Sequence, residues 1–227
     1  MIHQPVLSLF ACEKYALVDE PGPFQTAAQY ELLERYGKDY LFRNTLSLPL
    51  GLTFDSYLTE DSFLKLSPPE KATALLRAAV LANEKEAEKQ GLTPVQRFNL
   101  REDTKDRSLP EVVAARRKTA LQMTSFSQTR FAGHVSLNQR SILVLQMPFD
   151  RGWRAFQDGR PVPILKVDVG LLGVGLDPGK HEVELRYRNR FLVPGLLLTL
   201  ASVFVLGAGW WRWPRLTYAV KRRDSFA

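Results

Sequence analysis

The sequence has 227 residues, of which 45% are apolar and 24% are charged, and its net charge is +7. A chain of this size can bury a substantial core, and its only cysteine, Cys12, excludes an internal disulfide framework. The three histidines stand singly, without the spacing of metal ligands, so we expect neither a metal site nor a cofactor. The basic residues form no nucleic-acid-binding motif, so we expect no nucleic-acid partner.

The N-terminal part, residues 1–118, is predicted to mix helices with extended segments. Residues 27–37 place apolar side chains at helical spacing and end in Gly37, which predicts a short helix. Residues 40–58 alternate apolar and polar side chains around a Pro-Leu-Gly turn, which predicts extended structure.

The clearest helical signal covers residues 67–90. Ser67 and Glu70 have the spacing of a capping box, the two prolines between them suit a first helical turn, and an apolar stripe follows. The polar and basic stretch at 91–118 is predicted to be a linker or surface segment that includes a short helix at 110–118.

From residue 119 to residue 190 the pattern changes to short alternating runs separated by Asn, Gly, Pro and Asp. Turn signals at such intervals are typical of an antiparallel sandwich. The sequences QDGR at 157–160 and DPGK at 177–180 predict turns, because Asp-Gly tolerates the positive φ of tight hairpins. The predicted fold class is therefore α+β: a helical N-terminal part, then an antiparallel β-sandwich or jelly-roll-like domain at 119–190, and one C-terminal transmembrane helix.

Residues 191–213 are predicted to be that transmembrane helix. The stretch from Phe191 to Trp211 carries no charge, and about 20 apolar residues span the hydrocarbon core of a bilayer. Tryptophans at its end fit an interfacial aromatic belt. Basic side chains are denser after the helix than before it, which assigns the basic tail, residues 214–227, to the cytoplasm.

The N-terminus does not look like a signal peptide, because it lacks a basic region and acidic residues come early. Two explanations stay open at this point. The chain is tail-anchored with its domain in the cytoplasm, or it is the end of a longer polytopic protein.

The stretch MPFDRGWRAFQDGR, residues 147–160, holds the candidate substrate-binding residues. They are one tryptophan, two aspartates and two arginines: Trp153, Asp150, Asp158, Arg151 and Arg154. The indole could stack on a sugar ring, the carboxylates could accept hydrogen bonds from hydroxyls, and the guanidinium groups could hold a phosphate. The alternative is structural, with the indole in the core and the Asp-Gly pair in a hairpin turn. No arrangement of catalytic side chains is visible, so we expect no catalytic residue.

Two groups of residues carry a resemblance to a known family. The first lies in the β-patterned region and comprises Asp150, Gly152, Trp153, Asp158, Gly159, Gly179, His181, Val183, Leu185 and Tyr187. The second lies upstream and comprises Asn44, Leu48, Pro49 and Gly51. In this order they resemble the C-terminal region of the YfhO family of bacterial membrane proteins. Phe149 departs from the family pattern, where a tyrosine is usual, and a hydroxyl contact is lost there.

The resemblance implies a function that composition does not show. The family resembles polytopic membrane glycosyltransferases (GT-C-like) that use a polyprenyl-phosphate sugar to modify cell-envelope polymers such as teichoic acids. The catalytic membrane region is expected upstream of the matched residues, so enzymatic activity of this chain itself stays open.

The same resemblance implies a place and a role. The chain is expected to be the extracytoplasmic domain and last helix of such a protein in a bacterial cell membrane, in an acceptor-binding or stabilising role. Its expected partners are the lipid bilayer, an upstream polytopic membrane part, and a polyprenyl-phosphate sugar or an envelope glycan. The alternative is a non-enzymatic, membrane-anchored scaffold module that binds a glycan or a protein.

Overall fold

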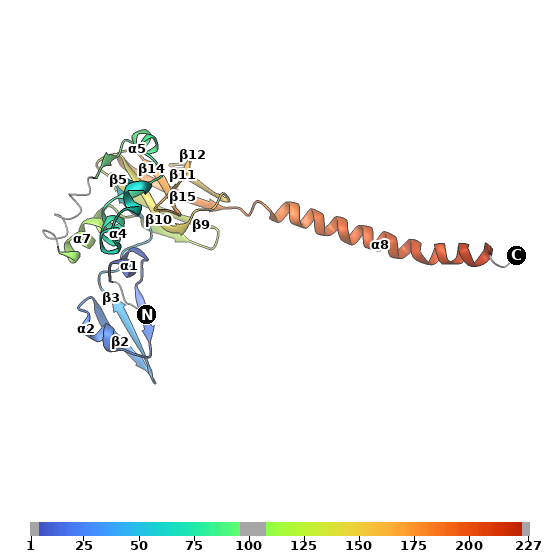
Figure 1. Cartoon of the computed structure of the whole chain (residues 1–227), viewed down its shortest axis with the longest axis horizontal. Coiled ribbons are helices and arrows are strands. Elements are labelled where there is room, and N and C mark those ends of the chain that lie inside the picture. The colour runs from blue at the N-terminus through green and yellow to red at the C-terminus, as the bar shows by residue number, and fades with distance from the viewer. Residues whose placement is uncertain (1–4, 96–107, 224–227) are drawn as a thin grey trace. The chain divides into compact units, whose positions relative to one another are not determined.

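The computed structural model describes residues 5–95 and 108–223 of the chain (Figure 1). The chain divides into two units, residues 1–187 and residues 188–227. The first unit combines antiparallel sheets with short helices, and the described part of the second unit contains one long helix. The predicted α+β class is confirmed.

Two antiparallel sheets form the predicted sandwich. The four-stranded sheet has the order β13 (Ile164–Val167), β14 (Leu171–Leu176), β10 (Ser141–Pro148), β4 (Leu52–Phe54). The five-stranded sheet has the order β12 (Arg160–Val162), β11 (Trp153–Gln157), β15 (Gly179–Tyr187), β9 (Arg130–Leu137), β8 (Gln122–Phe126). Alternate side chains of both sheets meet in one apolar cluster, which includes Phe131, Leu143, Leu172, Val183 and Leu185. The outward side chains of β9 and β15 are mostly polar, as expected for a sheet with one wet face.

Strand β10 is buried on both faces. Leu143 and Leu145 contribute to the sandwich core, whereas Ile142 and Val144 contribute to a second core. This position explains why residues 142–145 of β10 form an unbroken apolar run instead of an alternating one. The four-stranded sheet combines β4, which precedes residue 119, with β10, β13 and β14, which follow it. Residues on both sides of position 118/119 therefore belong to one unit.

The predicted helix at 67–90 is wrong as one element, because an extended segment interrupts it. Helix α4 (Pro68–Arg77) begins at the predicted capping box, where the Ser67 N–H donates to Glu70 Oε2 at 2.9 Å. It ends where the Arg116 guanidinium donates to the carbonyl oxygens of Leu76 and Arg77, at 2.9 and 2.8 Å. These bonds satisfy the last helical carbonyls, so the chain can leave the helix.

The interrupting segment is β6 (Ala79–Leu81), which is fully buried and pairs in parallel with β5 (Ser56–Thr59). Strand β7 (Thr93–Pro94) pairs with the other edge of β5. The connections between these parallel strands contain α3 (Glu60–Leu64), α4 and α5 (Glu84–Gln90). The apolar stripe that resembled a helix face therefore includes a buried strand.

The predicted helix at 27–37 is also wrong. Strand β2 (Tyr30–Tyr36) occupies most of it and pairs with β3 (Asp39–Asn44), which also pairs with β1 (Tyr15–Val18). Gly37 has a φ of 63° and allows the tight turn between β2 and β3. Cross-strand pairing decides the structure here, because the local spacing of apolar residues suits either element.

The remaining helices among the described residues of the first unit are short. They are α1 (Pro5–Phe10), α2 (Gly22–Thr26) and α7 (Leu109–Thr119). Helix α7 confirms the short helix predicted at 110–118, and it begins at a capping box formed by Ser108 and Glu111. The centre of the predicted linker, residues 96–107, lies outside the described residues.

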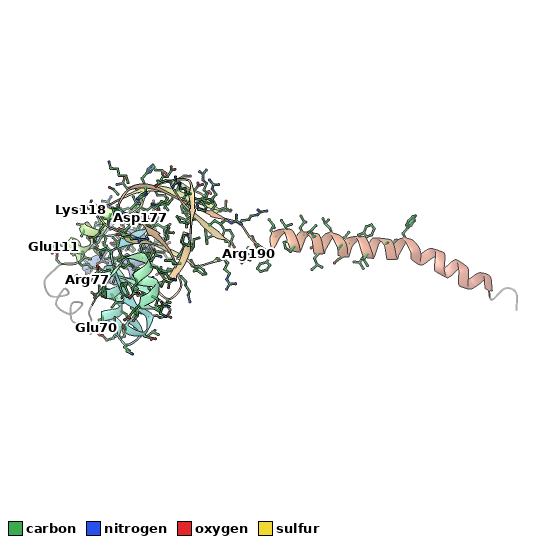
Figure 2. All side chains as sticks on the ribbon, turned by 90° about the horizontal axis from the view of Figure 1, so that it is seen from above. Glu70, Arg77, Glu111, Lys118, Asp177 and Arg190 are labelled. Carbon is green, nitrogen blue, oxygen red and sulfur yellow. The ribbon has the colours of Figure 1, made fainter. Side chains whose placement is uncertain are left out.

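The second unit contains helix α8 (Leu192–Arg223). Residues Leu192–Trp211 have a mean hydropathy of 2.1 and are long and apolar enough to cross a membrane. Figure 2 shows apolar side chains along this part of the helix. The helix continues to Arg223, so most of the predicted basic tail at 214–227 is helical, and the last four residues lie outside the described part.

Candidate functional site

Asp158 lies in the hairpin between β11 and β12 and joins it to β15. Asp158 and Gly159 have φ angles of 51° and 78°, which confirms the predicted Asp-Gly turn. Asp158 Oδ1 accepts the backbone N–H of Glu182 at 2.9 Å, and Oδ2 lies 2.7 Å from Nδ1 of His181. The other ring nitrogen of His181 lies 3.1 Å from the carbonyl oxygen of Asp177. Both ring nitrogens of His181 therefore have polar partners.

The contact between Asp158 and His181 favours the charged form of both groups. Burial by itself would lower the pKa of His181, but the hydrogen bond and charge of Asp158 outweigh it and raise the pKa. The hydrogen bond from His181 lowers the pKa of Asp158, and the backbone N–H of Glu182 lowers it further. The contact joins the hairpin to the neighbouring strand.

Gly179 belongs to the same cluster. Its φ is 131°, and a Cβ atom at this position would lie 3.3 Å from Nε2 of His181. A side chain would therefore press on the imidazole and strain the backbone at once. The Gly-x-His spacing that contributed to the family resemblance has this structural explanation.

Trp153 lies at the other end of β11. Its ring packs between those of Phe131 and Tyr187, with centroid distances of 5.2 and 5.0 Å. Asp150 closes the preceding turn by accepting the N–H of Gly152 at 2.6 Å. Both side chains therefore have structural partners, in line with the structural alternative for this stretch.

The five predicted binding residues do not converge on one point. The segment from Asp150 to Trp153 leads into β11, whereas Asp158 follows its end, about 16 Å further along the strand at about 3.3 Å per residue. Arg151 and Arg154 are exposed, and Arg154 pairs across the sheet with Arg186. Whether any of them binds a substrate stays a prediction.

A polar cavity of about 420 Å³ lies beside the cluster of Asp158 and His181. Besides His181, its polar lining comes from the end of α7 and from β8, β9 and β15: Lys118 (labelled in Figure 2), Gln122, His134, Ser136, Lys180 and Glu182. Within residues 5–95 and 108–223, these six side chains have no hydrogen-bonding or ion-pair partner. We call this cavity, with these lining residues, the polar cavity.

The residues of the polar cavity were missed by reading along the sequence. Cross-strand register brings them together, since His134 lies opposite both Glu182 and Gln122, and Ser136 lies opposite Lys180. The signal in the sequence is the polar alternation of β9 and β15, which shows an outward face but not the pairing. Ammonium, imidazole, amide, hydroxyl and carboxylate groups together can bind a ligand that is rich in hydroxyls and negatively charged.

A β-sandwich unit and an apolar helix long enough to cross a bilayer are the parts of a membrane-anchored protein. Residues 95–199 match the family model described as bacterial membrane protein YfhO. This stretch is a YfhO-family region, which confirms the resemblance seen in the β-patterned part of the sequence; the upstream residues that also resemble the family lie outside the match. It covers α7, β8 to β15 and the beginning of α8. No curated protein and no solved structure matches the chain.

Proposed function

We propose that this chain acts in the glycosylation of cell-envelope polymers with polyprenyl-phosphate sugars, as the extracytoplasmic domain and last helix of a YfhO-like membrane protein. Its β-sandwich unit has an acceptor-binding role, and the acceptor lies in the polar cavity. An upstream polytopic part supplies the catalytic membrane region.

The observation that carries this proposal is the set of unpartnered polar side chains in the polar cavity. Lys118 and Lys180 stand against one carboxylate, Glu182, so the cavity suits a polymer that carries phosphate groups and hydroxyls. All six side chains are exposed, so a ligand can reach them. They line a cavity beside the contact between Asp158 and His181, which joins the hairpin to the strand that carries Lys180 and Glu182.

Binding of purified teichoic acid to the full chain in phosphatidylcholine nanodiscs tests the acceptor role. We expect the double variant Lys118→Gln/Lys180→Gln to weaken binding about tenfold, because two charge-assisted contacts are lost. The matched control Lys85→Gln/Lys89→Gln removes two exposed lysines from α5 and should bind like the wild type. Equal binding by both double variants would contradict the acceptor role.

The extracytoplasmic position has its own test in cells that contain the complete membrane protein. In a Cys12→Ser background, Lys38→Cys places a thiol at an exposed turn between β2 and β3. We expect a membrane-impermeant maleimide to label this thiol in intact cells. Labelling that requires permeabilised cells would place the sandwich in the cytoplasm.

The non-enzymatic scaffold is the second candidate, and the sheet formed by β1, β3 and β2 favours it. One face of this sheet carries large exposed apolar side chains, including Tyr15, Leu17 and Tyr36. Such a face is typical of contact with another protein. If Leu17→Ser/Tyr36→Ser abolishes polymer glycosylation in cells while Lys118→Gln/Lys180→Gln does not, the scaffold is the better description.

A further inference from the structure

Three arginines form a row across one end of the five-stranded sheet. Arg186 of β15 lies directly opposite Arg130 of β9 on one side and Arg154 of β11 on the other. All three are exposed, and they lie on the outer face of the sheet, because their strand neighbours Phe131 and Ala155 belong to the sandwich core. We call these three residues the arginine row.

The arginine row carries more positive charge than the sheet neutralises. Arg130 donates to Glu184 Oε1 at 2.5 Å, and Arg186 donates to both oxygens of the same carboxylate at 2.8 and 2.7 Å. Arg154 has no hydrogen-bonding or ion-pair partner among residues 5–95 and 108–223. Three guanidinium groups against one carboxylate leave a surplus of positive charge. Like charges that lie opposite each other lower the stability of a sheet, so an anionic partner explains the row better than the fold does.

Aromatic rings gather at the same end of the sheet. The ring of Trp153 contacts those of Phe131 and Tyr187, and Phe126 packs edge-on against Phe131 with a centroid distance of 4.9 Å. Phe126 lies on the edge strand β8 and is 68% exposed. Basic and aromatic side chains together are typical of protein surfaces that lie against a membrane.

The same end of the sheet leads directly into the candidate membrane helix. Strand β15 ends at Tyr187 and α8 begins at Leu192, so residues 188–191 connect them. An extended chain spans at most about 3.6 Å per residue, which keeps the end of β15 within about 18 Å of the start of α8 in any arrangement of the two units. The connection adds the exposed cations Arg188 and Arg190 (labelled in Figure 2) and no acid.

We propose that the arginine row and Phe126 form a docking surface for an anionic lipid bilayer, which holds the sandwich against the membrane in one orientation. The negative potential of such a bilayer attracts basic groups and falls off within about 10 Å, and the short connection to α8 keeps the row near that range. Three neighbouring strands present the charges side by side, which suits an extended anionic surface. The docking surface shares no residue with the polar cavity.

Energy transfer from the turn between β8 and β9 to the bilayer surface measures this docking. The carbonyl oxygen of Thr129 in the turn accepts the N–H of Tyr187 at 2.8 Å, so the turn lies beside the arginine row. In the full chain with Cys12→Ser, a donor dye is attached to the exposed turn through Gln128→Cys, and the nanodiscs contain an acceptor dye on lipid headgroups. We expect more transfer in phosphatidylglycerol nanodiscs than in phosphatidylcholine nanodiscs, and high salt should remove the difference.

Arg130→Gln/Arg154→Gln tests the charge of the arginine row. We expect the ratio of docked to undocked protein in phosphatidylglycerol nanodiscs to fall about tenfold, because each basic group near an anionic surface strengthens the attraction severalfold. Arg130→Lys/Arg154→Lys keeps both charges and should keep the energy transfer of the labelled parent chain. The matched control Lys85→Gln/Lys89→Gln removes two exposed lysines from α5 and should also behave like the parent.

Equal transfer in the two kinds of nanodisc would overturn the docking surface and leave the arginine row to an acidic protein or polymer. A difference that survives in Arg130→Gln/Arg154→Gln would overturn it as well. An equal loss in the α5 control would show that net charge, and not this row, attracts the bilayer. The nanodiscs contain no sugar and the variants avoid Lys118 and Lys180, so failure here leaves the acceptor role to its own test.

Discussion

Asp168 is the most unusual titratable group among the described residues. It lies in the turn between β13 and β14, and its carboxylate accepts the N–H of Val80 at 2.6 Å. Its own N–H donates to the carbonyl oxygen of Val80 at 2.8 Å, so the turn is bonded to the buried strand β6. Its second carboxylate oxygen is buried without a partner. Burial outweighs the bond from Val80 and raises the pKa of Asp168 to about 7.

This raised pKa predicts a pH dependence of stability. The folded protein favours the neutral acid, whereas the unfolded chain ionises near its ordinary pKa of 3.8. The free energy of unfolding should therefore fall as the pH rises from about 4 to about 7, by on the order of a few kcal/mol. In Asp168→Asn this fall of the free energy of unfolding with pH should vanish. Urea titrations of the full chain in detergent micelles at several pH values would measure it.

The control for this prediction is Asp19→Asn, at an exposed loop position. The free energy of unfolding of this variant should fall with pH as it does in the wild type. If Asp168→Asn also shows this fall, Asp168 is not the source of the pH dependence, and its neutral form has no advantage in the fold.

At the scale of elements, β8 and β9 approach each other closely at one glycine. A Cβ atom at Gly133 would lie 2.6 Å from the carbonyl oxygen of Gln122 and 3.0 Å from the Leu121 side chain. We expect Gly133→Ala to lower the free energy of unfolding by about 1–3 kcal/mol, because backbone atoms of the edge strand must move. Urea unfolding of the full chain in micelles measures this loss.

A glycine with open space supplies the comparison. Gly170 lies in the β13–β14 turn, and nothing lies within 4 Å of a Cβ atom there. Gly170→Ala should change the stability by less than about 1 kcal/mol. Similar losses in the two variants would mean that the effect of Gly133→Ala comes from the alanine side chain in general and not from the close approach of β8.

At the scale of the whole molecule, the prediction concerns attachment to the membrane. An arginine near the middle of a spanning helix costs roughly 3 kcal/mol of insertion free energy, and Leu200 and Val203 lie near the middle of Leu192–Trp211. We expect Leu200→Arg/Val203→Arg to release much of the protein from membranes on alkaline carbonate extraction. The wild type should stay in the membrane fraction.

The control for attachment changes an exposed apolar residue outside the helix. Leu64 of α3 is 55% exposed, and Leu64→Arg should leave the protein in the membrane fraction. Continued membrane integration of Leu200→Arg/Val203→Arg would contradict α8 as the anchor.

The sequence by itself determined the features that depend on local chemistry. The apolar length of Leu192–Trp211, the capping box at Ser67 and the Asp-Gly hairpin at Asp158 were all predicted where the structure has them. Each depends on residues within a few positions of one another, so short-range spacing is sufficient to recognise it.

Tertiary structure alone decided the features that depend on distant partners. Ala79–Leu81 became a strand because β5 and the Arg116 guanidinium lie beside it, and both come from remote parts of the chain. The polar cavity exists because strand register places His134 opposite Glu182. The spacing of apolar residues and their secondary-structure propensities do not decide between helix and strand or between strand registers. The free energy that decides comes from burial and hydrogen bonding between distant parts of the fold.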